Sequence, residues 1–376
     1  LPTRFRDRAP RAIQDPDIRY HYFSGPDLAR GVNLTLSRNA GMSTAEVDAQ
    51  LAADPDSWVG VTGGHDPVAR LYDLWLDDTV ADVVYPTAGL SLLQYTDPDF
   101  QFACIQVYND WLAEFCSVDR DRLIGLAMIP TWDIDQGVRE LERAHDAGLR
   151  GAIMWSSPPG EREYSFFTDR YEPLWRAAAE RHMPLSIHIL AGHRTTGIDQ
   201  YGVTVEGTFY FGMTSRDEVQ RTVAELIAAG VFERHPDLHV VAAEGGIDYA
   251  ARLERRLDST YRGAWGPLDD RLKLLPSEYF RRNVHLTYIT DPVGLHNLRF
   301  TGADHFMWSS DYPHGAATWP RSAEALDAEF DDIGVDQAQR EQLTLGNVAA
   351  LYGIDLDVVR HPSPCITDRL DANARG

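Results

Sequence analysis

The stretch FMWSSDYPH, residues 306–314, begins as a buried β-strand would and ends in polar side chains. Its first residues are apolar, whereas Asp311 and His314 follow within a few positions. A carboxylate at the end of a buried strand needs a partner, because removing its charge from water without one is unfavourable. The stretch therefore predicts a strand of a buried sheet with a polar site at its carboxyl end.

The same unit recurs along the chain from about residue 71. A short, β-rich apolar run ends in a polar residue or a turn, and an amphipathic helix follows. We count about seven such strands on this pattern. They are residues 83–86, 123–130, 151–155, 185–190, 239–244, 284–289 and 306–311.

Helices are predicted between these strands. One runs from about residue 136 to 147 and ends at Gly148, since glycine often follows the last turn of a helix. Another begins at Ser215, because Ser215 and Glu218 form a capping-box pattern ahead of an apolar helical face. A further helix is expected around residues 347–352.

Parallel strands that alternate with helices form either an open doubly wound sheet or an eight-stranded barrel. A glycine-rich phosphate turn after the first strand would favour the open sheet, and the sequence contains none. We therefore predict an α/β fold, a distorted (β/α)8 TIM barrel, with residues 1–376 as a single domain. The barrel needs one strand more than the seven found here. We expect the missing strand to be the first of the barrel and to lie upstream of Leu1.

Two further segments complete this prediction. Residues 11–66 read as an insertion after the first strand, rich in Gly, Pro and Asp, with a weak strand candidate in IRYHYF. Residues 355–376 are expected to form a C-terminal arm.

The bulk composition narrows the class of function. Lys and Arg total 35 against 57 for Asp and Glu, and the net charge of −22 disfavours nucleic acid and anionic lipid surfaces as partners. No apolar run approaches the ~18 residues that span a bilayer. The three cysteines are far apart, which is typical of a reducing, cytoplasmic compartment. We expect a small-molecule substrate as the partner and leave a homo-oligomer open.

Polar residues at the carboxyl ends of the predicted strands are the candidate site, because the loops of a barrel converge at that face. They are His188, His193, Glu244, Asp291, Asp311 and His314.

His188 lies between Ile187 and Ile189 in an apolar strand. On its own, such a histidine is more often a hydrogen-bonded core residue than a ligand. Imidazole and carboxylate groups gathered at barrel strand ends suit a divalent metal ion, since nitrogen and oxygen donors fit zinc, manganese or iron. We interpret His188 as a metal ligand.

The carboxylates have alternative readings of their own. Asp311 is a candidate metal ligand and proton acceptor, or a cap of the next helix. Glu244 is a candidate metal ligand or catalytic group, or simply precedes a tight turn at Gly245. His193 and His314 are candidate catalytic residues that contact substrate, or solvated loop residues.

These motifs together resemble the amidohydrolase-2 branch of the amidohydrolase superfamily, which includes aminocarboxymuconate-semialdehyde decarboxylase. The segments that carry the resemblance are YPTAGL at 85–90, RLIGLAMIPTWD at 122–133, PLSIHI at 184–189, GVFERHPDLHVVAAEGG at 230–246, LERRLD at 253–258, MWSSDYPH at 307–314 and GNVAALYG at 346–353. They span most of the chain in the family's order.

The resemblance implies a distorted (β/α)8 barrel with a divalent metal, zinc first and iron or manganese as alternatives. It implies that His188 is the metal-binding histidine of the fifth strand and Asp311 the aspartate of the eighth. The family's remaining ligands, a histidine-containing pair on the first strand, are expected upstream of Leu1. The sequence departs from the family's decarboxylases at Glu244, where they carry a catalytic histidine.

Because of this departure we put hydrolysis first. In this hypothesis a metal held by His188, Asp311 and upstream ligands lowers the pKa of a bound water towards ~7, and Asp311 takes the proton. His193, His314 or Glu244 then orients substrate or returns the proton to the leaving group. The substrate is expected to be a small carboxylic acid derivative, with an aromatic one as an option, because Trp155, Tyr249, Trp308 and Tyr312 could place rings near the mouth of the barrel. The alternative is non-oxidative decarboxylation of an aromatic or enol acid, and a metal-free binding protein is a further possibility.

Overall fold

The computed structural model describes residues 1–14, 20–26, 28, 32–54, 57–193, 204–263, 271–367 and 370. The chain divides into two compact units. The first comprises residues 1–126, 310–328 and 353–376, and the second comprises residues 127–309 and 329–352. No helix within the described residues is long and apolar enough to cross a membrane.

Ten strands appear in the described part of the chain. They are β1 Arg11–Gln14, β2 His21–Ser24, β3 Val32–Asn33, β4 Asp82–Val84, β5 Leu123–Met128, β6 Gly151–Met154, β7 Leu185–His188, β8 Val240–Ala243, β9 Val284–Tyr288 and β10 Phe306–Trp308.

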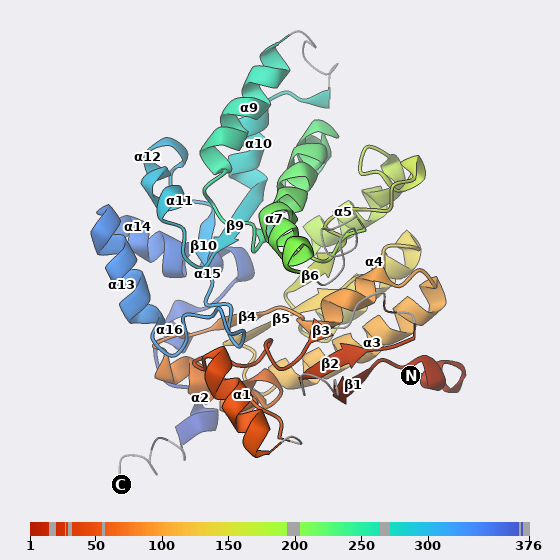
Figure 1. Cartoon of the computed structure of the whole chain (residues 1–376). Helices are drawn as coiled ribbons and strands as arrows, with labels where there is room; N and C mark the ends of the chain where they lie inside the picture. The colour runs from red at the N-terminus through yellow and green to blue at the C-terminus, as the bar shows by residue number, and fades with distance from the viewer. Residues whose placement is uncertain are drawn as a thin grey trace. The chain divides into compact units, whose positions relative to one another are not determined.

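The helices are equally well bounded (Figure 1). They are α1 Thr44–Ala53, α2 Pro67–Leu76, α3 Pro98–Cys116, α4 Ile134–Asp146, α5 Glu172–Glu180, α7 Val205–Ala228, α8 Val231–Arg234, α9 Ala250–Arg262, α10 Pro276–Asn283, α11 Pro292–His296, α12 Leu298–Thr301, α13 Ser322–Ile333, α14 Gln337–Glu341, α15 Asn347–Tyr352 and α16 Leu356–Val359.

Strands β4 to β10 form a parallel sheet in the order β10-β9-β8-β7-β6-β5-β4. The seven strands predicted from the apolar runs are therefore confirmed, and so is the α/β class. Every residue of β5, β6, β7 and β8 is buried. This explains their nearly continuous apolar sequence, because parallel strands covered on both faces do not alternate with polar residues.

The first unit carries a second, antiparallel sheet of three strands in the order β1-β2-β3. Residues 21–23 of the candidate IRYHYF lie in β2, so this part belongs to the small sheet rather than to the parallel one. The predicted insertion at residues 11–66 holds these strands and α1. Ser43 starts α1 with a capping box to Glu46.

Residues 355–376 were predicted as a C-terminal arm, and their described part includes the short helix α16. Buried Arg122, just ahead of β5, donates to the backbone oxygens of Val358 at 2.8 Å and His361 at 2.6 Å. The arm therefore supplies carbonyl acceptors for a guanidinium that is almost fully buried.

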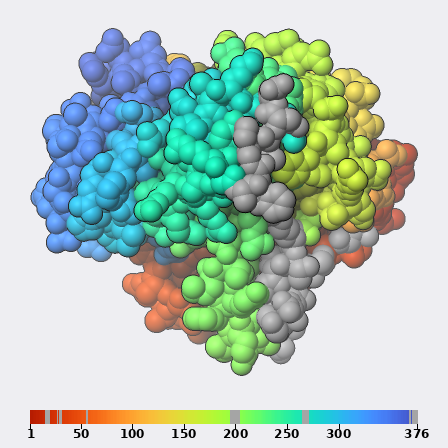
Figure 2. Space-filling model, turned by 90° about the horizontal axis from the view of Figure 1, so that it is seen from above, coloured from red at the N-terminus to blue at the C-terminus, as the bar shows by residue number. Residues whose placement is uncertain are grey.

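In the second unit, helix α4 agrees with the prediction and α7 does not. Asp133 caps α4, and Gly148 follows it with φ of 96°. Helix α7 begins at Val205 with Thr204 as its cap, so the expected start at Ser215 is wrong. The first turns of α7 expose apolar side chains, including Val205, Phe209 and Met213. Part of the surface of α7 is the green area in Figure 2.

Three histidines lie at the amino ends of neighbouring strands in this unit. His239 precedes β8, His285 is the second residue of β9, and His305 precedes β10. The ring nitrogens His239 Nδ1 and His285 Nε2 are 3.0 Å apart. Burial lowers the pKa of His285 to about 3 and that of His305 to about 4. Burial also lowers the pKa of His239, so all three rings are uncharged at neutral pH. His305 is buried, whereas His239 and His285 are partly exposed.

Candidate active site

His188 is the last residue of β7, and its side chain is 7% exposed. Its Nδ1 lies 2.6 Å from the backbone oxygen of Ile189. A carbonyl oxygen only accepts, so Nδ1 carries the hydrogen of this bond. The other ring nitrogen, Nε2, is therefore left to bind a proton or a metal ion, the arrangement that metal-binding histidines commonly show.

Glu244 follows β8 and faces this nitrogen. Its Oε1 lies 3.1 Å from His188 Nε2. A neutral Nε2 and a carboxylate oxygen are both electron-pair donors, so a contact this short needs a proton or a cation between them. Two ligands bound at about 2.1 Å to one divalent ion lie about 3–3.4 Å apart at bond angles of about 90–109°, and this separation falls in that range.

The backbone at Glu244 is held in an unusual conformation. Its φ is 57°, in the left-handed region, and its N–H donates to Thr287 Oγ1 at 2.9 Å. Leu190 and Asp311 also have positive φ, at 71° and 59°. All three follow a strand of the parallel sheet, and non-glycine residues adopt this conformation only where the surrounding structure imposes it.

His193 packs among aromatic rings. Its ring lies edge-on to Trp155 at 4.8 Å and to Trp132 at 5.4 Å between centroids. Trp155 is completely buried, whereas Trp132 and His193 are partly exposed. Trp155 therefore contacts His193 from within the core, and its place near the substrate stays a prediction.

A buried network holds the loop that carries His193. The N–H of His193 donates to the backbone oxygen of Ser157 at 3.1 Å, and the N–H of Ser156 donates to that of Ala191 at 3.2 Å. Two hydrogen bonds connect helix α7 to this segment. Ser157 Oγ donates to Glu218, and Thr222 Oγ1 donates to the backbone oxygen of Ser156.

Glu218 was read from the sequence only as part of a capping box, and that reading is wrong. It lies in the middle of α7 and turns its carboxylate to Ser157, which is distant in sequence. Gly192 explains the close fit, since a Cβ there would lie 1.7 Å from Glu218 Oε1 and 2.3 Å from Ser157 Oγ. No local pattern in the sequence signals this contact.

Asp291, another strand-end candidate, has a structural role. Its Oδ2 accepts from the N–H groups of Ile247 at 2.7 Å and Asp248 at 2.8 Å, and its Oδ1 accepts from Gly294 at 2.8 Å. It therefore caps α11 and anchors the turn that follows Glu244. Its charge is matched by backbone donors, which removes the need for a metal ion or substrate as partner.

Asp311 and His314 belong to the first unit. Asp311 Oδ1 lies 3.9 Å from His314 Nδ1, and His314 Nε2 lies 3.2 Å from Thr87 Oγ1. Because His188 and Glu244 belong to the second unit, the convergence of Asp311 with them stays a prediction. Within the described residues, no group of three or more His, Cys, Asp or Glu side chains is arranged to hold a metal ion.

Tyr312 and Pro313 connect these two residues and are firmly held. Tyr312 OH donates to Asp73, and burial together with Asp73 raises the pKa of the phenol. Arg70 Nη2 donates to the backbone oxygen of Tyr312 at 3.3 Å. The N–H of Ala40 donates to that of Pro313 at 3.1 Å. The hydroxyl of Tyr312 therefore belongs to this scaffold, and the place of its ring near the substrate stays a prediction.

The sequence of this chain is similar to those of several decarboxylases. The chain is 27% identical over 250 residues to a gamma-resorcylate decarboxylase of Rhizobium sp. (strain MTP-10005), covering 62% of this chain and 73% of that protein. It is 25% identical over 193 residues to the 2-amino-3-carboxymuconate-6-semialdehyde decarboxylase of Dictyostelium discoideum, covering 50% of each.

Solved structures share the fold. An amidohydrolase from Mycobacterium avium subsp. paratuberculosis K-10 superposes with a TM-score of 0.72 at 21% identity, over 94% of both chains. A 5-carboxyvanillate decarboxylase from Novosphingobium aromaticivorans, whose structure contains manganese, superposes with a TM-score of 0.61 at 19% identity, over 83% of this chain and 85% of that one. Residues 47–354 match the Amidohydrolase family, so the chain belongs to this family, as its motifs predicted.

Proposed function

We propose that this protein is a metal-dependent decarboxylase that removes carbon dioxide from a hydroxylated aromatic acid without oxidation. The observation that carries the proposal is the similarity over 250 residues to gamma-resorcylate decarboxylase. This favours the alternative over the hydrolysis that we put first from the sequence. Glu244 remains the one feature that favours hydrolysis, since the sequence resemblance implies a histidine there in decarboxylases.

His188 and Glu244 are the proposed metal ligands of the second unit, and Asp311 is the proposed ligand of the first. Support comes from the 3.1 Å contact of His188 Nε2 with Glu244 Oε1, which needs a cation or a proton. Manganese is our first choice of metal because the related 5-carboxyvanillate decarboxylase contains it, and zinc, our choice from the sequence, becomes the alternative. The bound ion would orient and polarise the oxygen atoms of the substrate.

The reaction breaks the bond between the ring carbon and the carboxylate. Carbon dioxide leaves, the electron pair stays on the ring carbon, and a proton completes a new C–H bond. A hydroxyl group on the ring helps, because it delocalises the electron pair as the bond breaks. We assign His193 as the proton donor and His314 as a substrate contact, with Trp132 packing against the aromatic body.

Product analysis in labelled water tests this proposal. The protein is loaded with manganese and incubated with 2,6-dihydroxybenzoate and with 5-carboxyvanillate in deuterium oxide. Decarboxylation releases carbon dioxide and places one deuterium on the ring of the product. A panel of aromatic esters and amides in oxygen-18 water serves as the hydrolysis arm, and incorporation of the label there, without carbon dioxide release from the acids, overturns the proposal.

A second experiment examines the assigned roles. His193→Gln is expected to lower kcat by about a hundredfold or more, as loss of a proton donor does, with unchanged metal content. His65→Gln, a change at an exposed loop histidine, is the control. An unchanged rate and pH profile in His193→Gln would remove this residue from the mechanism.

A further inference from the structure

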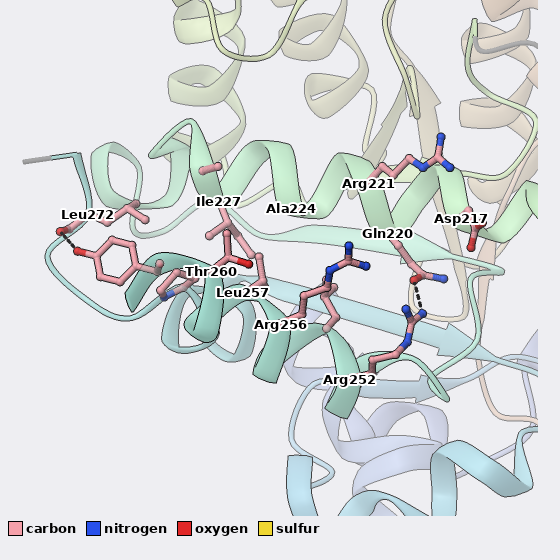
Figure 3. A pocket seen from close by; sticks show the side chains of 14 residues that line it. Asp217, Gln220, Arg221, Ala224, Ile227, Arg252, Arg256, Leu257, Thr260 and Leu272 are labelled. Atoms are coloured by element: carbon pink, nitrogen blue, oxygen red, sulfur yellow. Dashed lines mark hydrogen bonds between the residues drawn. The ribbon is translucent and has the colours of Figure 1, made fainter. Parts of the chain in front are cut away.

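A cavity of about 680 Å³ lies between α7 and α9 in the second unit, lined by residues outside the candidate active site (Figure 3). Pockets that bind small molecules have volumes of about 300–1,000 Å³ and mostly apolar walls. Here the apolar walls come from facing positions of the two helices and the segment before α10. They include Ala224, Ile227, Ala228, Leu253, Leu257 and Leu272.

Charge is concentrated at one end of this cavity. Arg221, Arg252 and Arg256 line it, with Asp217 as the single acidic lining residue. In Figure 3, Arg252 and Arg256 reach from α9 towards α7, and the apolar end lies further along both helices. This end of the cavity is positively charged, whereas the protein as a whole has a net charge of −22.

These two guanidinium groups are available to a ligand. Arg252 Nη2 donates to Gln220 Oε1 at 3.1 Å, which leaves its charge unmatched. Both side chains are exposed, and neither forms an ion pair with another of the residues that the structure describes. Arginine pairs readily with carboxylates, since its planar fork of donors fits both oxygens.

The length and the apolar walls of the cavity indicate the part of the ligand that lies beyond its carboxylate. Arg252, Arg256 and Thr260 follow one another at intervals of one helical turn, so the cavity extends along α9 for about 12 Å. Leu253 and Leu257 are partly exposed along it. An extended hydrocarbon chain would cover these side chains while its head group reached the arginines.

We propose that the cavity between α7 and α9 binds an amphipathic carboxylate, with the carboxylate at Arg252 and Arg256 and an extended apolar chain along Leu253 and Leu257. This site is separate from the proposed metal ligands and does not depend on the proposed reaction.

Calorimetric titration with decanoate tests the proposal on the whole chain. Decanoate is expected to bind with a submillimolar Kd, while decanol and acetate, which each lack one half of the ligand, bind at least tenfold more weakly. Octanoate is expected to bind about fifteenfold more weakly than decanoate, because it buries two fewer methylene groups. Equal affinity for decanol and decanoate would overturn the role of the arginines.

Matched variants locate the binding. The double variant Arg252→Gln/Arg256→Gln is expected to bind decanoate at least tenfold more weakly, whereas Arg255→Gln, a neighbouring exposed arginine outside the cavity, binds it normally. Leu257→Asn should weaken binding while leaving acetate unaffected. Thermal unfolding of each variant checks that it is folded.

His188→Asn separates this cavity from the active site. The proposal expects this variant to bind decanoate as the unchanged protein does. If His188→Asn abolishes binding and the double arginine variant does not, decanoate occupies the active site and the proposal fails.

Discussion

His188 and Glu244 follow different strands, β7 and β8, yet their side chains meet at 3.1 Å. The hydrogen bond from His188 Nδ1 to the backbone of Ile189 fixes which nitrogen faces Glu244. The sequence predicted both residues as ligands because each ends an apolar run. It did not predict the orientation of the His188 ring. That orientation depends on a hydrogen bond to a backbone oxygen, which every residue has, so no residue type in the sequence indicates it.

Metal binding to this pair is testable through stability. A ligand that binds only the folded state at a hundred times its Kd stabilises it by about 2.7 kcal/mol. Manganese is therefore expected to raise the Tm of the protein by several degrees and to raise that of His188→Asn and Glu244→Gln much less. Thermal unfolding with and without chelator measures this.

Equal stabilisation of the variants would contradict metal binding by His188 and Glu244. If the metal raises the Tm of both variants as much as that of the unchanged protein, the two residues are a simple ion pair. Metal content after native purification gives an independent reading of the same question.

Gly192 is a second residue whose identity the structure explains. Gly192→Ala would place a Cβ 1.7 Å from Glu218 Oε1, so the loop carrying His193 or the carboxylate must move. We expect a loss of about 2–3 kcal/mol in the free energy of unfolding, in the range for overpacked sites. Denaturant unfolding measures it.

The control for this change is Gly160→Ala, because a Cβ there has no neighbour within 4 Å among the described residues. The double variant Gly192→Ala/Glu218→Ala should recover part of the loss by removing the clashing carboxylate. An equal loss in both single glycine variants would contradict the packing argument.

At the scale of elements, the strands were predictable and the start of α7 was not. Strands β5 to β8 are completely buried apolar runs, and most of β9 and β10 is buried, so their signal is local. Helix α7 extends well upstream of its amphipathic part, and its first turns carry exposed Phe209 and Met213 rather than a periodic apolar face. Ser215 and Glu218 matched a capping pattern by spacing alone, while Glu218 serves a contact to a distant segment.

The carboxyl end of β9 gives a prediction at this scale. Asp291 holds three backbone N–H groups that link the start of α11 to the turn after β8. Asp291→Ala is therefore expected to reduce the free energy of unfolding by about 2–3 kcal/mol, because it leaves buried donors without partners. Asp291→Asn retains an acceptor oxygen and should lose less.

Activity per folded molecule distinguishes the structural role from a catalytic one. Asp291→Asn is expected to keep most of its kcat once the folded fraction is accounted for. A loss of kcat greater than a hundredfold in a fully folded Asp291→Asn would restore the original reading of this residue as part of the site.

For the whole molecule, His285 and His305 contribute to how stability depends on pH. The pKa of His285 is lowered to about 3 and that of His305 to about 4, against about 6.5 for an unfolded chain. Below pH 6.5 the unfolded chain therefore binds more protons than the folded one, and stability falls as the pH drops. Burial raises the pKa of Glu329 and Asp77, and these carboxyls act in the opposite direction.

We expect the free energy of unfolding to fall by on the order of 2 kcal/mol between pH 7 and pH 5. Urea unfolding at the two pH values measures it. His305→Asn should reduce this difference, whereas a change at the exposed His361 serves as the control for losing one imidazole. A pH dependence that is the same in His305→Asn and the unchanged protein would rule out this residue as its source.

The left-handed backbone at Leu190, Glu244 and Asp311 has a practical consequence for engineering. Glycine relieves such conformations, so a laboratory evolution campaign that selected only for survival at high temperature would tend to install glycine at these positions. Two of the three are proposed metal ligands. Such a campaign would select variants with higher thermal stability and without catalytic activity. A library of variants must therefore be screened for turnover as well as for thermal stability.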